Sequence, residues 1–184
     1  MRVFSLLFSV LIFAQEADKL VDSTTQNLVK LENVTISAIR AGINTPISFN
    51  NVEKEQIEIE NIGKDLPMVL KNLPSVVTTS DAGAGVGYTG IRIRGSDASR
   101  VNITINGFPF NDAESHGTYW VNLPDFVSSV EEIQVQRGVG TSTNGSGAFG
   151  ASININTENP SKIPFSSISS SLGSFATFKN TLKF

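Results

Sequence analysis

The chain has 184 residues, a formal net charge of −3, and is 40% hydrophobic but only 17% charged. That length allows one domain of ordinary size with additional segments. A mildly acidic chain without basic runs is unlike a nucleic-acid-binding protein. The sequence contains no cysteine, which excludes disulfides and thiolate metal sites.

The first residues have the layout of a secretory signal peptide. Arg2 supplies a minimal basic region, residues 3–13 form an apolar run, and Ala14 precedes a candidate cleavage site. The run is shorter than the roughly 20 residues that a membrane-spanning helix needs. We expect residues 1–14 to be a signal peptide and the polar residues 15–30 to be a flexible leader. A buried N-terminal strand or helix is the alternative.

Residues 31–40 form a strand-like segment behind this leader. Val34, Ile36 and Ala38 alternate with Thr35 and Ser37, which is the side-chain period of a β-strand. Such a segment can add to the open edge of a sheet in another protein. The alternative is an ordinary first strand of the domain.

Strands and one helix are predicted over residues 45–79. Residues 45–49 and 52–62 predict a strand leading into a Glu-rich segment, whose carboxylates we interpret as a solvated face because no neighbouring feature would desolvate them. Apolar residues at helical spacing predict a short amphipathic helix over residues 65–72, ended by Pro74. A strand is expected at residues 76–79.

The glycine-rich stretch at residues 80–88 has the composition of a phosphate-binding loop. That function needs a following helix, whereas residues 89–94 alternate and predict a strand. We therefore interpret residues 80–88 as a loop available for ligand contact. Residues 101–105 predict another strand, which the Asn-Gly turn at Asn106 closes before residues 108–110 continue.

Residues 111–120 hold the single histidine and the single tryptophan of the chain. Asp112, Glu114 and His116 have the residue types of a metal-binding triad. One histidine in a polar loop is more often a surface residue, and we predict no metal site here. A short helix is expected at residues 123–130.

Two alternating runs, residues 133–137 and 152–156, predict half-buried strands. The residues between them are rich in glycine, which favours a tightly folded turn. Beyond residue 160, apolar residues alternate with Ser, Thr, Asn and Lys over residues 166–172 and 175–184. Transmembrane barrel strands show this pattern, with apolar side chains toward lipid and polar ones toward the lumen.

Two long stretches resemble the plug domain of TonB-dependent outer-membrane transporters. They read RIRGSDASRVNITINGFPFND from Arg92 and VEEIQVQRGVGTSTNGSGAFGASININT from Val130. The resemblance implies an α+β fold, with a small mixed sheet of about four strands and short helices over residues 45–158. Residues 165–184 would then begin a transmembrane β-barrel of about 22 strands, and the chain would be the N-terminal fragment of that protein.

The resemblance also implies site residues. Residues 31–40 look like the TonB box, whose matching positions are Glu32, Asn33, Val34, Thr35, Ile36, Ser37 and Ala38. Arg94 and Arg137 match plug arginines that form salt bridges with the barrel, unless they are simply solvated. Two loops would face the ligand, with Asp81, Tyr88, Asp112, Glu114, His116, Tyr119 and Trp120 as candidate contacts, although the aromatic rings could instead pack against the barrel. Structural glycines are expected at Gly95, Gly107, Gly138, Gly147 and Gly150.

The function implied is transport without covalent chemistry or a cofactor. A plug inside an outer-membrane barrel would bind a scarce solute, for which an iron–siderophore or related iron chelate is the first choice. A TonB-type energy transducer in the periplasm would capture the box and open the plug. The alternatives are a secreted or periplasmic ligand-binding module without transport, and a periplasmic enzyme that uses Asp112, Glu114 and His116.

Overall fold

The computed structural model describes residues 40–42, 44–140, 144, 147–174 and 176–184. The chain divides into two units, residues 1–35 and 36–184, and every described residue belongs to the second. The predicted signal peptide, the leader and the TonB-box positions lie outside the described residues. Within the described part, no helix has the length and apolar character needed to cross a membrane.

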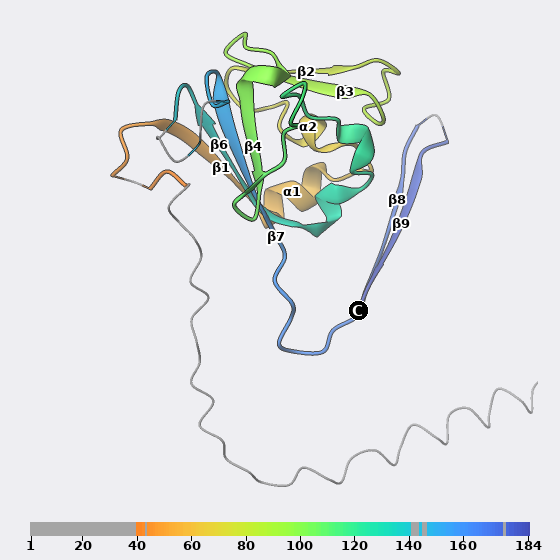
Figure 1. Ribbon diagram of the computed structural model, residues 1–184. Coiled ribbons are helices and arrows are strands. Elements are labelled where there is room, and N and C mark those ends of the chain that lie inside the picture. The colour runs from red at the N-terminus through yellow and green to blue at the C-terminus, as the bar shows by residue number, and fades with distance from the viewer. Residues whose placement is uncertain (1–39, 43, 141–143, 145–146, 175) are drawn as a thin grey trace, which may run out of the picture. The chain divides into compact units, whose positions relative to one another are not determined.

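A five-stranded mixed sheet forms the centre of the second unit, in the order β1-β6-β7-β4-β5 (Figure 1). Only the β4–β7 pair is parallel, and the other neighbours are antiparallel. The mixed sheet confirms the predicted fold class, with one strand more than expected. The strands are β1 (Ser48–Glu53), β4 (Val101–Ile105), β5 (Phe108–Pro109), β6 (Val130–Arg137) and β7 (Ala151–Thr157).

The helices are short, and one of them forms where no helix was predicted. Strand β1 ends at Glu53 and the helix α1 (Lys54–Glu60) follows, where the sequence predicted a Glu-rich segment after a strand and no helix. Lys, Glu and Gln are good helix formers, and this helix buries only Ile57, so it shows no apolar stripe. The other helices are α2 (Leu66–Val69) and the 3-10 turns η2 (Ala98–Arg100), η3 (Trp120–Asn122) and η4 (Phe126–Ser129).

Two of these helices are shorter than predicted. The helix expected over residues 65–72 is reduced to the four residues of α2, which has a proline in its first turn. The helix expected over residues 123–130 is the single 3-10 turn η4, because Val130 already belongs to β6.

The core lies between one face of the sheet and the helices, which Figure 1 shows on the same side of it. Isoleucine and valine side chains of β4, β6 and β7 meet α1, α2 and the 3-10 turns there. The most deeply buried large side chains of this core are Ile57, Leu66, Leu70, Ile93, Ile103, Ile133, Ile153 and Ile155.

The opposite face of β6 and β7 is also buried, so the prediction of half-buried strands is wrong. Gln134, Gln136, Ser152 and Asn154 alternate with the apolar residues as predicted, but each is at most 4% exposed. The alternation predicted which side chains share a face. It could not predict that this second face is covered by residues from distant parts of the chain.

Two antiparallel pairs complete the unit. Strands β2 (Val76–Ser80) and β3 (Thr89–Ile93) flank the glycine-rich loop, and β8 (Ser167–Leu172) and β9 (Phe178–Lys183) form the predicted C-terminal hairpin. The hairpin has two contrasting faces. Its exposed, largely apolar face carries the opposed pairs Ile168 with Leu182 and Leu172 with Phe178, with the hydrogen-bonded pair Ser170 and Asn180 between them. Its polar face consists of Ser167, Ser169, Ser171, Lys179, Thr181 and Lys183.

Candidate functional site

The described chain begins with a segment that is fastened to strand β6. Arg40 donates from both terminal guanidinium nitrogens to the two carboxylate oxygens of Glu132, which is a bidentate ion pair. The Ala41 N–H donates to Gln134 Oε1 at 2.8 Å, and Gln134 Nε2 donates back to the Ala41 carbonyl at 3.0 Å. We call Arg40, Ala41, Glu132 and Gln134 the β6 clasp. It fixes Arg40, the last residue of the segment 31–40 that resembles the TonB box, and Ala41, which follows it.

A ladder of buried amides supports this clasp. Gln134 Nε2 also donates to Asn51 Oδ1 of the edge strand β1, and Gln136 Nε2 donates to Gln134 Oε1, both at 2.9 Å. Gln136 in turn accepts from Asn144 Nδ2 at 2.9 Å. Both hydrogens and both lone pairs of the Gln134 amide are therefore used. Sequence reasoning missed these residues, although two glutamines opposite an apolar strand face were a visible signal of a covered polar face.

The glycine-rich loop after β2 lines a cavity together with the hairpin turn. The cavity has a volume of about 730 Å³, and its walls include Lys64, Gly83, Val86 and Leu172. Tyr88 is 68% exposed, and Asp81 is also exposed. The second predicted ligand-facing loop, residues 111–120, does not line this cavity. Of the two predicted ligand-facing loops, only residues 80–88 contribute to this cavity.

The Asp112 carboxylate accepts hydrogen bonds from within its own loop. Its Oδ1 accepts from the Ser115 N–H at 2.7 Å, from the Ser115 hydroxyl at 2.8 Å and from the Glu114 N–H at 3.1 Å. The backbone and hydroxyl bonds from Ser115 hold the pKa of Asp112 below its ordinary value. His116 is exposed, with its backbone in the left-handed region at φ 57°. Among the described residues no group of three His, Cys, Asp or Glu side chains could hold a metal ion.

The two aromatic side chains at the end of this loop point to different environments. Trp120 is 2% exposed and belongs to the core, so the structure departs from the expectation that it faces ligand. Its neighbour Tyr119 is 50% exposed and donates its hydroxyl to Ser115 Oγ at 3.2 Å. Trp120 begins the η3 turn packed beside β3, which is a tertiary contact that the local sequence does not encode. Only Tyr119 of this pair is presented at the surface.

Arg94 directly follows β3 and Arg137 ends β6, and the Arg94 side chain reaches the glycine that follows Arg137. Arg137 donates to Ser48 Oγ at 2.7 Å and to the Pro74 carbonyl at 3.4 Å. A Cβ added at Gly138 would lie 3.0 Å from Arg94 Nη1, which places the Arg94 guanidinium beside that turn. Neither arginine forms an ion pair with a carboxylate of the described residues.

The expected structural glycines fall into different classes. Gly95, Gly107 and Gly138 have φ values of 77°, 85° and 102°, which favour glycine. At Gly150 an added Cβ would lie 2.3 Å from the Cβ of Ser96, so the close approach requires glycine there. At Gly147 an added Cβ would meet no atom within 4 Å, and nothing in the described structure requires a glycine at this position.

Comparison with known proteins places this fold and these segments in context. The model of the TonB-dependent Receptor Plug Domain family matches residues 41–152, which include β1, β4, β5, β6 and the first two residues of β7. The vitamin B12 transporter BtuB of Vibrio vulnificus is 33% identical over 110 residues, which cover 60% of this chain and 17% of that protein.

Two solved structures share the fold. The ferric-catecholate import receptor Fiu of E. coli is 25% identical with a TM-score of 0.52, over 74% of this chain and 18% of that one. The ferric yersiniabactin uptake receptor FyuA of Yersinia pestis is 17% identical with a TM-score of 0.55, over 73% of this chain and 20% of that one. The chain spans about a fifth of the length of each of these proteins.

Proposed function

The chain belongs to the family of TonB-dependent receptor plug domains, and from this premise we propose that it is the plug-bearing part of an outer-membrane active transporter for a scarce metal chelate. The single observation that carries the proposal is the family match across the central sheet. Membership implies a TonB partner and a small-molecule ligand. The relatives are transporters and receptors, which favours a function without covalent chemistry.

The N-terminal side of the domain is suited to transmit a pull. In this proposal a TonB-type transducer in the periplasm pairs with residues 32–38 by strand addition. The β6 clasp comes directly afterwards, and the amide of Gln134 connects it to both β6 and β1. Force on the leader would therefore reach Arg40 and Ala41 first and the edge strand β1 next.

The ligand is proposed to bind at the loops of residues 80–88 and 111–120. Tyr88 and Tyr119 are exposed aromatic rings there, and flat rings can stack on an extended chelate. Asp81, Glu114 and His116 are exposed polar groups of the same loops, while Asp112 serves its turn. A ferric chelate is the first candidate. Cobalamin is the second, because the vitamin B12 transporter of Vibrio vulnificus is 33% identical over 110 residues.

The hairpin β8–β9 is proposed to be the first part of the surrounding barrel. Its apolar face, with Ile168 at 80% and Leu172 at 91% exposure, has the composition of a lipid-facing surface. Arg94 and Arg137 then have the fixed planar guanidinium groups that could pair with carboxylates of the barrel wall. The protein would reside in the outer membrane after export through the signal peptide at residues 1–14.

Uptake by cells that produce the full-length protein from its own gene tests this proposal. The probes are ferric citrate, ferrichrome and ferrioxamine with radioactive iron, and cyanocobalamin with radioactive cobalt. We expect deletion of the gene to abolish uptake of one probe, and the wild-type gene to restore it. Val34→Pro should not restore uptake, because proline removes a backbone donor from the pairing strand. Leu28→Pro, in the leader, is the matched control and should restore it.

The alternative function is a ligand-binding module without transport. It predicts that cells bind a probe at their surface equally well with wild type, with Val34→Pro and without the transducer. Uptake that does not depend on Val34 would contradict the proposed coupling. Binding without any uptake would favour the module.

A further inference from the structure

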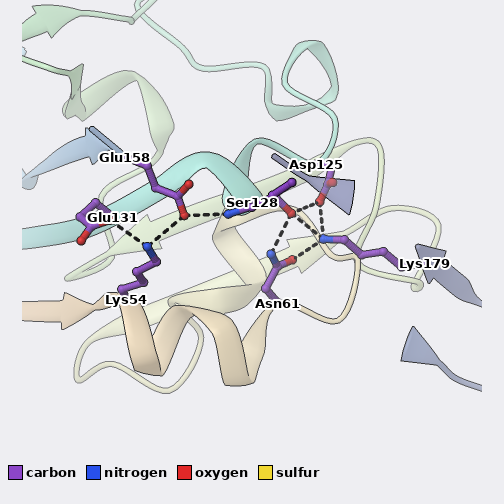
Figure 2. A network of polar contacts seen from close by, with 8 residues as sticks. Lys54, Asn61, Asp125, Ser128, Glu131, Glu158 and Lys179 are labelled. Atoms are coloured by element: carbon purple, nitrogen blue, oxygen red, sulfur yellow. Dashed lines mark hydrogen bonds and ion pairs between the residues drawn. The ribbon is translucent and has the colours of Figure 1, made fainter. Parts of the chain in front are cut away.

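The polar face of the C-terminal hairpin contacts the plug through Lys179. The Lys179 ammonium donates to Asn61 Oδ1 at 3.0 Å, to Ser128 Oγ at 2.7 Å and to the carboxylate of Asp125 (Figure 2). These three acceptors match the three donors of an ammonium group. The Lys179 side chain is only 14% exposed, although its carboxylate partner is 50% exposed. This cation has therefore exchanged most of its water for groups of the plug.

The acceptors around Lys179 are themselves connected. Asn61 Nδ2 donates to Ser128 Oγ at 3.0 Å, and Ser128 Oγ donates to Asp125 Oδ1 at 2.8 Å. The loop after α1 and the turn η4 thus form one preorganised acceptor group. A charge that is held by several fixed acceptors binds more strongly than a single exposed ion pair.

A second ion-pair group lies further along β9. Lys183 Nζ donates to Glu158 Oε1 at 2.7 Å, and Lys54 Nζ reaches the same oxygen at 3.3 Å and Glu131 Oε2 at 3.2 Å. Burial opposes the charge of Glu158, but the hydrogen bonds and charges of Lys183 and Lys54 outweigh it and lower the pKa of Glu158. Figure 2 shows Lys54 between the two carboxylates. This group joins the start of α1, the chain just after β7, and strand β9.

The two lysines determine the register of the hairpin on the plug. Lys179 and Lys183 are four residues apart on one face of β9, which separates them by roughly 13 Å along the strand. A slip by one residue would turn Phe178 and Leu182 toward the plug and expose both cations on the other face. A polar cavity of about 280 Å³ lies at the same interface, lined by hairpin residues such as Ser169 and Thr181.

We propose that Lys179 and Lys183 dock the plug onto the β8–β9 hairpin, and that this flank of the plug keeps its contact with the hairpin throughout the transport cycle. The second half of this statement rests on the proposed function. We name the docked surface, made by Lys54, Asn61, Asp125, Ser128 and Glu158, the anchored flank.

The free edge of strand β1 in the described sheet is the reason to expect that the plug moves there and that the anchored flank stays in place. Strand β1 pairs only with β6 in the described sheet, and its outer edge has no strand neighbour there. The β6 clasp leads into this edge. Releasing β1 breaks neutral backbone bonds, the amide contact from Gln134 to Asn51 and one arginine contact, from Arg137 to Ser48. Releasing Lys179 removes a cation from three acceptors at once, one of them a carboxylate. The plug is therefore expected to open at β1 and to stay attached at the anchored flank.

An engineered disulfide tests both whether the hairpin docks on the plug and whether this contact persists during transport. A Cβ at Gly63 would lie 3.8 Å from the Cβ of Lys179, which is the separation that a disulfide requires. The chain has no native cysteine, so Gly63→Cys with Lys179→Cys gives a defined pair. Gly63 has φ 84°, which strains any side chain at that position. The single variant Gly63→Cys controls for this strain, and the single variant Lys179→Cys controls for the loss of the ammonium group. The full-length protein is used, in cells and in their outer membranes.

The expected result is spontaneous cross-linking of the double variant, seen as a mobility shift on non-reducing gels. Uptake of the radiolabelled probe that wild type imports should differ by less than about twofold between oxidised cells and the same cells reduced with dithiothreitol. A double variant that reaches the membrane without cross-linking would overturn the docking. A cross-linked variant that imports only after reduction would overturn the immobility. If wild type imports no probe, the proposed function fails, while the gel still decides the docking.

A mutant cycle keeps the docking testable if the double cysteine variant does not accumulate. The variants are Lys179→Met, Asp125→Asn and their combination, compared by thermal unfolding of the full-length protein. The midpoint shift of the combined variant is expected to be smaller than the sum of the two single shifts, because both changes remove the same contact. Additive shifts would overturn the docking.

Discussion

The β6 clasp predicts that trypsin cleaves slowly after Arg40. A protease must draw its substrate into an extended form, and the bond between Arg40 and Ala41 is held on both sides. The Arg40 guanidinium is bound by Glu132, and the Ala41 N–H and carbonyl are both bound by Gln134. Cleavage therefore requires the clasp to open first.

The substitution Gln134→Leu removes the amide and keeps an apolar side chain of similar size. Two hydrogen bonds to the Ala41 backbone are lost, each worth about 0.5–1.5 kcal/mol, or about 1–3 kcal/mol together. Since about 1.4 kcal/mol is a factor of ten, the open population should rise by about 5–150-fold. When opening is fast, the rate of proteolysis follows that population. The assay is limited digestion of outer membranes, with the fragment that begins at Ala41 identified by mass.

A matched control separates opening of the clasp from general destabilisation. Thr104, on β4, is 4% exposed and donates to Asn154 Oδ1 at 2.7 Å. Asn154 lies between Thr104 and Gln134 in the sheet, so this change disturbs the neighbouring strands while the hydrogen bonds from Gln134 to Ala41 stay in place. Thr104→Val should lower the stability of the sheet without accelerating cleavage after Arg40. The reasoning is refuted if Gln134→Leu leaves the cleavage rate unchanged, or if Thr104→Val accelerates it as much.

Two further predictions concern stability. Gly150→Ala should lower the free energy of unfolding by about 1–3 kcal/mol, because the added methyl group clashes with Ser96. Gly147→Ala should leave the free energy of unfolding unchanged. Thermal unfolding measures both variants, and equal effects would contradict the packing described. The pKa of Glu158 lies below its ordinary value of 4.5, so its contacts with Lys183 stabilise the fold above that pH and are lost as the pH falls through the lowered pKa. The difference in unfolding temperature between wild type and Glu158→Gln should accordingly be full at neutral pH and shrink in acid below about pH 4, and a difference that grows in acid would refute this assignment.

The sequence predicted those parts of the fold that depend on local periodicity. Alternation along β6, β7, β8 and β9 gave the strands and the side chains that share each face. The turn at Asn106 and Gly107 followed from its dipeptide, and both residues have positive φ. The resemblance of two long motifs gave the fold class, which the family match confirms.

The parts that could not be predicted depend on contacts between distant residues. Gln134 binds Ala41, 93 positions earlier, and Lys179 binds Asn61, 118 positions earlier. No local pattern marks such partners. Trp120 was expected to face ligand because its loop resembles a ligand-facing plug loop, but its side chain lies in the core, in the η3 turn that contacts β3. The helix α1 was missed because it buries a single side chain and so has no amphipathic stripe.

The measurement that tests the central claim most directly is binding of the transducer's periplasmic C-terminal domain to the full-length protein in outer membranes. Wild type is compared with Val34→Pro, with Leu28→Pro as the control. We predict capture by wild type and by Leu28→Pro, stronger in the presence of the imported probe, and loss of capture with Val34→Pro. Equal capture of all three, or capture of none in the presence of that probe, would contradict energy-coupled transport through residues 32–38.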